Sequence, residues 1–168
     1  MKKCSHDKSI KIIKNIYKND EIISLHEPRF FGNEKKYLID CIDSSYVSSI
    51  GKYVDRFENE MANISSTKKA IAVVNGTSAL QVALKLSGVK NNEEVITQAL
   101  TFVATANAIL YLNASPIFLD VNIETMGLSD KALNDFLNKF GELRDDGTYN
   151  KKTGKRIAAC LPMHTFGF

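Results

Sequence analysis

Apolar residues recur at helical spacing along the first part of the chain. Ile10, Ile13 and Tyr17 share one side of a helix over residues 10–17. Pro28 bars a helix through residues 27–28. Two further amphipathic helices are expected on either side of a small-residue loop at residues 44–51. The first is capped by Asn33 and turns Leu38, Ile39 and Ile42 inward, and the second carries Tyr53, Val54, Phe57 and Met61 on one face. These patterns predict an N-terminal helical segment, residues 1–66.

The pattern changes near residue 67, where short apolar runs begin to alternate with helical periods. Alternation of strand and helix is typical of a parallel sheet with helices on its faces. We therefore expect an α/β domain over residues 67–168. The expected strands are residues 70–74, 94–97, 116–121 and 156–162, and the expected helices are residues 77–86, 102–112 and one capped by Ser129.

Residues 141–155 interrupt this alternation. The segment contains Asp145-Asp146-Gly147 and ends on Thr153-Gly154, and both sequences favour turns. We interpret it as an exposed excursion that forms a small hairpin.

Composition narrows the class of protein. The chain has 168 residues, of which 44% are hydrophobic and 24% are charged, with a net charge of +3. These values are typical of a soluble globular protein and exclude extensive disorder. No apolar run approaches the length of a membrane span. Basic residues are densest in residues 1–18, which we interpret as a solvated helix face; a nucleic-acid or membrane-surface role is the alternative.

Cysteine and histidine residues give no metal signature. Cys4, Cys41 and Cys160 are odd in number and widely spaced, and the histidines have no partner at ligand spacing. We expect no zinc site and a reducing, cytoplasmic setting.

The junction after residues 70–74 is the first candidate for chemistry. Gly76, Thr77 and Ser78 follow an expected strand and open an expected helix, where free backbone N–H groups and hydroxyls suit a phosphate. An ordinary capped helix is the alternative. The loop has no lysine and a single glycine, so it is neither a Walker-type loop nor a dinucleotide fingerprint.

Two more residues follow expected strand ends. Phe102 could stack on a flat cofactor ring, although its spacing also fits packing in the core. His164 could donate to or accept from a ligand, although a lone histidine is often structural. Ligands of open parallel sheets bind beyond the carboxyl ends of the strands, so these features indicate one site at one sheet edge without identifying the ligand.

Five motifs occur in an order and spacing that resemble the DegT/StrS-type pyridoxal-phosphate-dependent sugar aminotransferases, and in detail the legionaminic-acid pathway type. The resemblance runs from about residue 28 to the end. The motifs are FGNE at 31–34, YVSSIGKYVDRFE at 46–58, NGTSAL at 75–80, LTFVATANAI at 100–109 and PMHTFG at 162–167.

The resemblance implies a fold-type I large domain, with helices on both faces of its sheet, that binds pyridoxal 5'-phosphate. Gly76, Thr77 and Ser78 would contact the cofactor on its phosphate side, and Phe102 would stack on its ring. Ser48, Ser49 and Gly51 would lie near a nucleotide-linked keto-sugar, with His164 close to the site. It further implies an amino-acid donor, expected to be glutamate, a homodimer, and a role in amino-sugar biosynthesis for surface glycans.

Two groups of that family have no match here. Its cofactor-binding lysine and the aspartate that pairs with the pyridine nitrogen lie in later segments, so no catalytic residue is assigned within this chain. We interpret the chain as an N-terminal, truncated part of such an aminotransferase, inactive alone. The alternatives are a sugar dehydratase of the same family and a non-catalytic remnant or interaction module.

Overall fold

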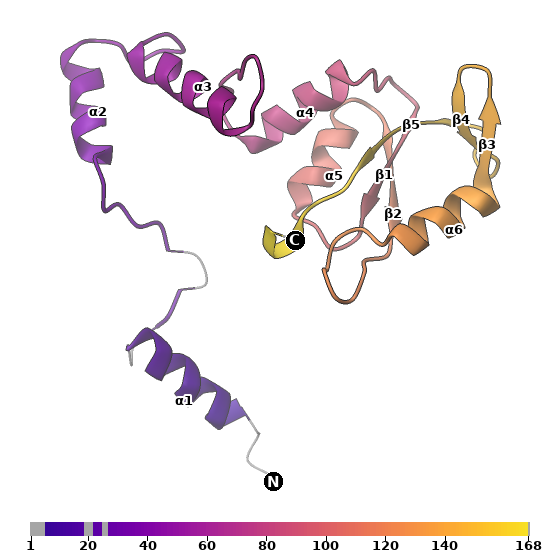
Figure 1. Cartoon of the computed structure of the whole chain (residues 1–168), viewed down its shortest axis with the longest axis horizontal. Helices are drawn as coiled ribbons and strands as arrows, with labels where there is room; N and C mark the ends of the chain where they lie inside the picture. Colours follow the sequence, from indigo (N-terminus) through magenta and orange to yellow (C-terminus); the bar gives the residue numbers. More distant parts are fainter. Residues whose placement is uncertain (1–5, 19–21, 25–26, 168) are drawn as a thin grey trace. The chain divides into compact units, whose positions relative to one another are not determined.

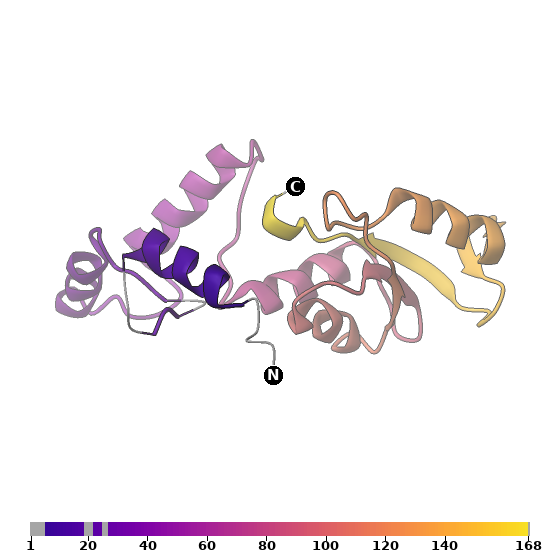
Figure 2. The same cartoon turned by 90° about the horizontal axis from the view of Figure 1, so that it is seen from below.

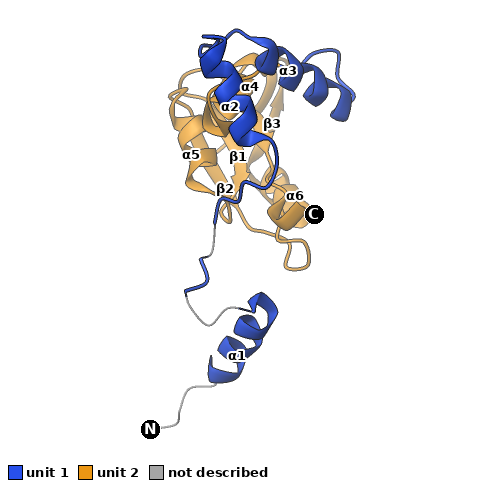
Figure 3. Cartoon of the chain, turned by 90° about the vertical axis from the view of Figure 1, so that its left-hand side faces the viewer, with its two compact units in different colours: residues 1–70 blue, residues 71–168 orange. Residues whose placement is uncertain are grey.

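The computed structural model describes residues 6–18, 22–24 and 27–167 (Figure 1). The chain divides into two compact units, residues 1–70 and residues 71–168 (Figure 3). Within the described residues no helix is long and apolar enough to cross a membrane. The domain boundary expected between residues 66 and 67 stays a prediction.

The described residues of unit 1 form the helices α1 (His6–Tyr17), α2 (Glu34–Asp43) and α3 (Lys52–Ile64). Asn33 precedes α2 as expected, but its side chain makes no capping hydrogen bond. Instead the Glu34 carboxylate turns back and accepts a hydrogen bond from the Gly32 N–H at 2.9 Å.

The inward face predicted for α2 is wrong for this unit. Leu38, Ile39 and Ile42 are 64%, 57% and 67% exposed. The reason is that α2 meets α3 through a different stripe, which includes Tyr37 and Asp40. Residues three and four apart share one side of a helix, so this contact turns Ile39 and Ile42 away from α3. Leu38 lies at the edge of the contact and lines the pocket between the two helices.

Unit 2 is built on a five-stranded sheet with the order β2-β1-β5-β4-β3. Its strands are β1 (Glu94–Gln98), β2 (Ser115–Leu119), β3 (Gly141–Arg144), β4 (Gly147–Asn150) and β5 (Arg156–Leu161). The three strands β2, β1 and β5 are parallel, while β4 and β3 are antiparallel additions. The expected α/β class is confirmed, with a mixed but mostly parallel sheet.

Three helices cover this sheet, α4 (Gly76–Leu86), α5 (Val103–Leu110) and α6 (Asp130–Phe140). Helices α4 and α5 lie on one side of the sheet and α6 on the other (Figure 2). Ser129 caps α6 as predicted and accepts a hydrogen bond from the Ala132 N–H at 3.1 Å. The buried apolar cluster of the unit is formed by Leu84, Val89, Val95, Ala108, Ile109 and Ala114.

The strand predicted at residues 70–74 is not present. These residues belong to no strand of the described sheet, and Ile71 and Val74 are 80% and 87% exposed. An apolar, β-branched run favours extended backbone, but a strand also needs a neighbour that completes its hydrogen bonds. Later segments of the chain supply every strand of this sheet.

The hairpin predicted in residues 141–155 is confirmed as β3 and β4, but it is less exposed than expected. The Asn150 side chain is buried, and its Nδ2 donates to Glu94 Oε2 at 2.9 Å. Arg156 forms an ion pair with Glu93 at 3.1 Å. The first contact ties the hairpin to the start of β1, and the second ties the start of β5 to the residue before β1.

Candidate functional site at the carboxyl edge of the sheet

The carboxyl ends of β1 and β5 form the edge where the site residues of unit 2 gather. The two strands are adjacent and parallel, so Gln98 and Leu161 end at the same edge. Phe102 follows β1 and His164 follows β5. The first turn of α4 lies on the same side of unit 2 as the short 3-10 turn Thr165–Gly167, in both Figure 1 and Figure 2.

The start of α4 presents hydrogen-bond donors. Asn75 caps the helix, and its Oδ1 accepts from the Ser78 N–H at 2.9 Å. The Ala79 N–H then makes the first helical bond, to the Asn75 carbonyl at 3.1 Å. Because a helix offers no internal acceptor to its first N–H groups, those of Gly76 and Thr77 point out of the first turn. A Cβ placed on Gly76 would meet no atom within 4 Å, so the backbone here is open to approach.

The start of α4 is an ordinary capped helix, as the alternative interpretation of the sequence predicted. Its remaining donors also fit a phosphate. The cap uses one backbone donor, and two backbone donors with the hydroxyls of Thr77 and Ser78 remain next to it. The positive end of the helix dipole favours an anion at this position.

Phe102 stands at the start of α5 and does not pack in the core. It is 75% exposed, with extended backbone angles of φ −68° and ψ 145°. Its aromatic face is therefore accessible within unit 2, as ring stacking requires. The neighbouring Thr101 and Thr105 hydroxyls are 2.7 Å apart and brace the turn that carries it.

His164 is exposed, and the residues on both sides of it are held by Gln98. Gln98 is a site residue that the sequence reasoning did not single out. The signal was a glutamine at the last position of a strand that is buried along its whole length. Polar side chains are buried when partners satisfy them.

The three expected substrate residues Ser48, Ser49 and Gly51 lie in unit 1, in the loop that precedes α3. Ser48 Oγ accepts a hydrogen bond from the Ile50 N–H at 3.4 Å. Gly51 has a φ of +154°, and a Cβ there would come within 3.3 Å of the Tyr46 Cβ. Glycine therefore permits the sharp entry into α3. Ser48 and Gly51 line a small cavity of about 90 Å³.

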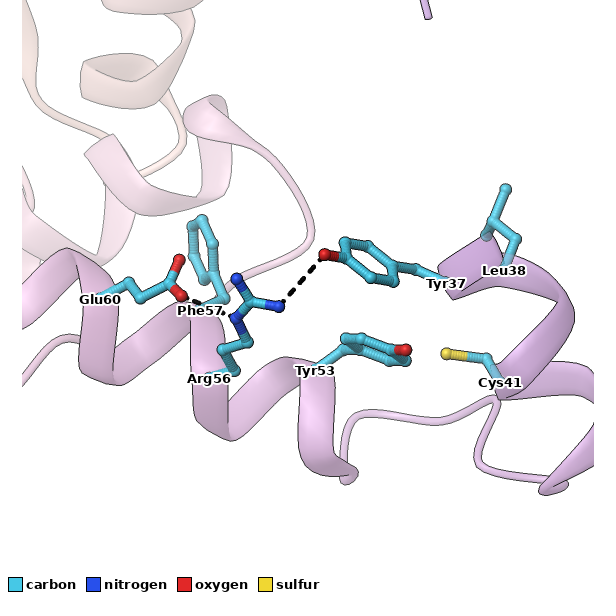
Figure 4. A pocket seen from close by; sticks show the side chains of 7 residues that line it. All are labelled: Tyr37, Leu38, Cys41, Tyr53, Arg56, Phe57 and Glu60. Carbon is cyan, nitrogen blue, oxygen red and sulfur yellow. Dashed lines mark hydrogen bonds and ion pairs between the residues drawn. The ribbon is translucent and has the colours of Figure 1, made fainter. Parts of the chain in front are cut away.

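A larger pocket of about 350 Å³ lies between α2 and α3, and sequence reasoning did not find it (Figure 4). Arg56 bridges it, with Nη1 donating to the Tyr37 hydroxyl at 3.2 Å and Nε to Glu60 Oε1 at 2.6 Å. The rings of Tyr37 and Tyr53 lie 4.8 Å apart. The lining residues are Tyr37, Leu38, Cys41, Tyr53, Arg56, Phe57 and Glu60.

Asp40 is the electrostatic centre of this helix pair. Its carboxylate accepts hydrogen bonds from Lys52 Nζ at 2.5 Å and from the Tyr53 hydroxyl at 2.9 Å. The Lys52 ammonium, followed by the Tyr53 hydroxyl, lowers the pKa of Asp40. In return the hydrogen bond to Asp40 raises the pKa of Lys52, while desolvation and the same carboxylate raise the pKa of Tyr53.

Among the described residues, no group of three His, Cys, Asp or Glu side chains is arranged to hold a metal ion. Cys41 and Cys160 are free thiols, and burial raises the pKa of the Cys160 thiol. Of the cysteines and histidines that the sequence offers as ligands, Cys4 and His26 lie outside the described residues.

The chain belongs to the DegT/DnrJ/EryC1/StrS aminotransferase family, which it matches over residues 30–167. It is 43% identical over 146 residues to the GDP-perosamine synthase of Vibrio cholerae, covering 87% of this chain and 35% of that protein. It is also 38% identical over 129 residues to EpsN of Bacillus subtilis, described as a putative pyridoxal phosphate-dependent aminotransferase, covering 77% of this chain and 32% of that protein.

Solved structures show the same fold. A DegT/DnrJ/EryC1/StrS aminotransferase from Brucella abortus superposes with a TM-score of 0.67 at 24% identity, over 81% of this chain and 34% of that one. The 3-amino-5-hydroxybenzoic acid synthase superposes with a TM-score of 0.65 at 27% identity, over 83% of this chain and 32% of that one. The chain thus spans about a third of the length of the relatives it matches.

Proposed function

We propose that this chain forms the N-terminal third of a pyridoxal-phosphate-dependent sugar aminotransferase and that the carboxyl edge of its sheet holds the cofactor. The observation that supports the proposal is the placement of three features on the same side of unit 2. These are the open donors at the start of α4, the exposed ring of Phe102 and the segment that carries His164.

Each of these groups has a distinct role in the proposal. The N–H groups of Gly76 and Thr77, with the hydroxyls of Thr77 and Ser78, bind the phosphate. Phe102 covers one face of the pyridine ring, and His164 lies at the rim. When bound, the cofactor would supply an electron sink and would carry the amino group between a donor and a carbonyl acceptor.

The acceptor that we propose is a nucleotide-linked keto-sugar. The relatives from Vibrio cholerae and Caulobacter vibrioides are named GDP-perosamine synthases, and one from Pseudomonas aeruginosa is named an aminotransferase of a UDP-linked 3-oxo sugar. The first two names favour a GDP-linked sugar over the legionaminic-acid type that the motifs suggest. The name of the Pseudomonas aeruginosa relative also favours amino transfer over the sugar dehydration that the sequence left as an alternative.

The remaining parts of the proposal concern the substrate loop and the assembly. Ser48, Ser49 and Gly51 contact the sugar nucleotide, glutamate is the amino donor, and the complete enzyme is a homodimer that makes amino sugars for surface glycans. The donor is tested by incubating the complete gene product with a GDP-linked keto-sugar and glutamate, and by following 2-oxoglutarate. Absence of 2-oxoglutarate would contradict the proposed reaction.

Cofactor binding is tested on this chain by calorimetric titration with pyridoxal 5'-phosphate and, for comparison, with pyridoxal. We expect the phosphate-bearing compound to bind at least about tenfold tighter, because the donors of α4 act on the phosphate. The double variant Thr77→Val, Ser78→Ala should lose most of this preference. Equal affinity for both compounds would contradict the assignment of this site.

A further inference from the structure

Gln98 is a fully buried polar residue at the point where β1 ends and the candidate site begins. We propose that Gln98 is a positioning residue that sets the segments of Phe102 and His164 relative to each other. This inference rests on the proposed function, because it concerns the same site. It assigns to Gln98 a role in cofactor binding that is exerted through the loops it holds.

The first half of the argument concerns the segment after β5. Gln98 Oε1 accepts a hydrogen bond from the Met163 N–H at 2.9 Å, and Gln98 Nε2 lies 3.2 Å from Thr165 Oγ1. These two residues flank His164 directly. The Gln98 side chain therefore holds the backbone of Met163 on one side of His164 and the side chain of Thr165 on the other.

The second half concerns the turn that leads to Phe102. Gln98 Nε2 also donates to the Leu100 carbonyl at 3.1 Å, two residues before Phe102. It lies 3.2 Å from the Met126 carbonyl, which in turn accepts the Thr165 hydroxyl at 2.8 Å. The end of β1, the loop around Met126 and the segment after β5 thus meet at one amide group.

The chemistry of this position calls for glutamine. The loops require an acceptor and donors at the end of one neutral, buried side chain, and the glutamine amide supplies a carbonyl oxygen and two N–H donors. A glutamate would place a carboxylate against two backbone carbonyls. A methionine would fill a similar volume but leave the Met163 N–H and the carbonyls without this partner.

Thr97, the preceding residue, provides a matched comparison. It is also fully buried, and its Oγ1 donates to the Leu161 carbonyl at 2.8 Å. This bond joins β1 to β5 but reaches neither loop. Thr97→Val therefore removes a buried hydrogen bond next to Gln98 and separates a general loss of stability from a loss of loop positioning.

The test compares Gln98→Met and Thr97→Val in two measurements on this chain. The first is amide hydrogen exchange at Met163 and Met126, normalised to the core amides of α5. We expect exchange at both loop amides to be at least about tenfold faster in Gln98→Met and nearly unchanged in Thr97→Val, since exchange reports local opening. The second is the dissociation constant for pyridoxal 5'-phosphate, expected to rise about tenfold in Gln98→Met and less than about twofold in Thr97→Val.

The outcomes separate this inference from the proposed function. If amide exchange at Met163 and Met126 is no faster in Gln98→Met than in Thr97→Val, the positioning role of Gln98 is overturned. Faster loop exchange with an unchanged dissociation constant would also overturn it, because Gln98 would then brace loops that do not shape the cofactor site. If the wild-type chain binds no pyridoxal 5'-phosphate, the proposed cofactor site of this chain is contradicted. The exchange comparison then decides by itself whether Gln98 positions the loops.

Discussion

Asn75 does two things at the start of α4. Its side chain accepts the Ser78 N–H, and because the helix begins directly after it, the N–H groups of Gly76 and Thr77 have no acceptor within the helix. A cap of this type stabilises a helix while it directs the remaining donors toward one region of space.

Replacing Asn75 tests the cap directly. Asn75→Ala should lower the free energy of unfolding by about 1 kcal/mol, because the Ser78 N–H loses its acceptor. Asn75→Ser retains an acceptor oxygen and should lose much less. Urea denaturation followed by circular dichroism measures both, and equal losses in the two variants would show that the side-chain bond to Ser78 does not stabilise α4.

The Asp40 carboxylate makes the helix pair of unit 1 sensitive to acid. Because the pKa of Asp40 is lowered in the folded protein, chiefly by Lys52, its contribution to stability is present above the ordinary value of 3.8. That contribution is lost as the pH falls through the lower pKa of the folded state. A carbon-detected NMR titration should give Asp40 a midpoint below 3.8, and Lys52→Met should raise it. A wild-type midpoint at or above 3.8 would contradict the ion pair.

At the scale of elements, the segments predicted well are those in which a cap and a period agree locally. The helix after Ser129 is of this kind, and the strand from Glu94 was found from a short apolar run that is buried along its length. The failure at residues 70–74 has a physical cause, because strand formation depends on a neighbour that local sequence does not reveal. The role of Gln98 was missed for a similar reason, since its partner Thr165 is 67 positions further along the chain.

Helix α4 offers a matched pair of leucines. Leu84 is 4% exposed and belongs to the core, whereas Leu86 is 81% exposed. Leu84→Ala should cost about 2–5 kcal/mol of unfolding free energy because it leaves a cavity. Leu86→Ala should change it by no more than about 0.5 kcal/mol. Similar losses in denaturation experiments would show that α4 does not pack on the sheet in this way.

The β3–β4 hairpin depends on a buried polar contact. Asn150→Ala should cost about 1–3 kcal/mol, because the buried Glu94 carboxylate loses the amide that faces it. Tyr149→Phe removes an exposed hydrogen bond to Asp146 from the same strand and serves as the control. If both variants unfold at the same urea concentration, the Glu94–Asn150 contact does not anchor the hairpin.

For the whole molecule, the ordered set of motifs predicted the family and the α/β class, and both are confirmed. Phe102 and His164 follow strands that end at one sheet edge, and the start of α4 lies on the same side of unit 2, but the role of each residue stays a prediction. The loop of Ser48, Ser49 and Gly51 belongs to the other unit, and its proposed contact with substrate also stays a prediction. A chain that spans about a third of its relatives carries part of the machinery that the family uses.

The central claim is that the carboxyl edge of the sheet in unit 2 receives the cofactor. The most direct measurement is a titration of the ¹⁵N-labelled chain with pyridoxal 5'-phosphate, followed through the amide resonances. The account predicts that the largest shifts occur at Gly76 and Thr77, with further shifts near Phe102 and His164. Shifts confined to the α2–α3 pocket of unit 1, or no saturable shifts, would contradict it.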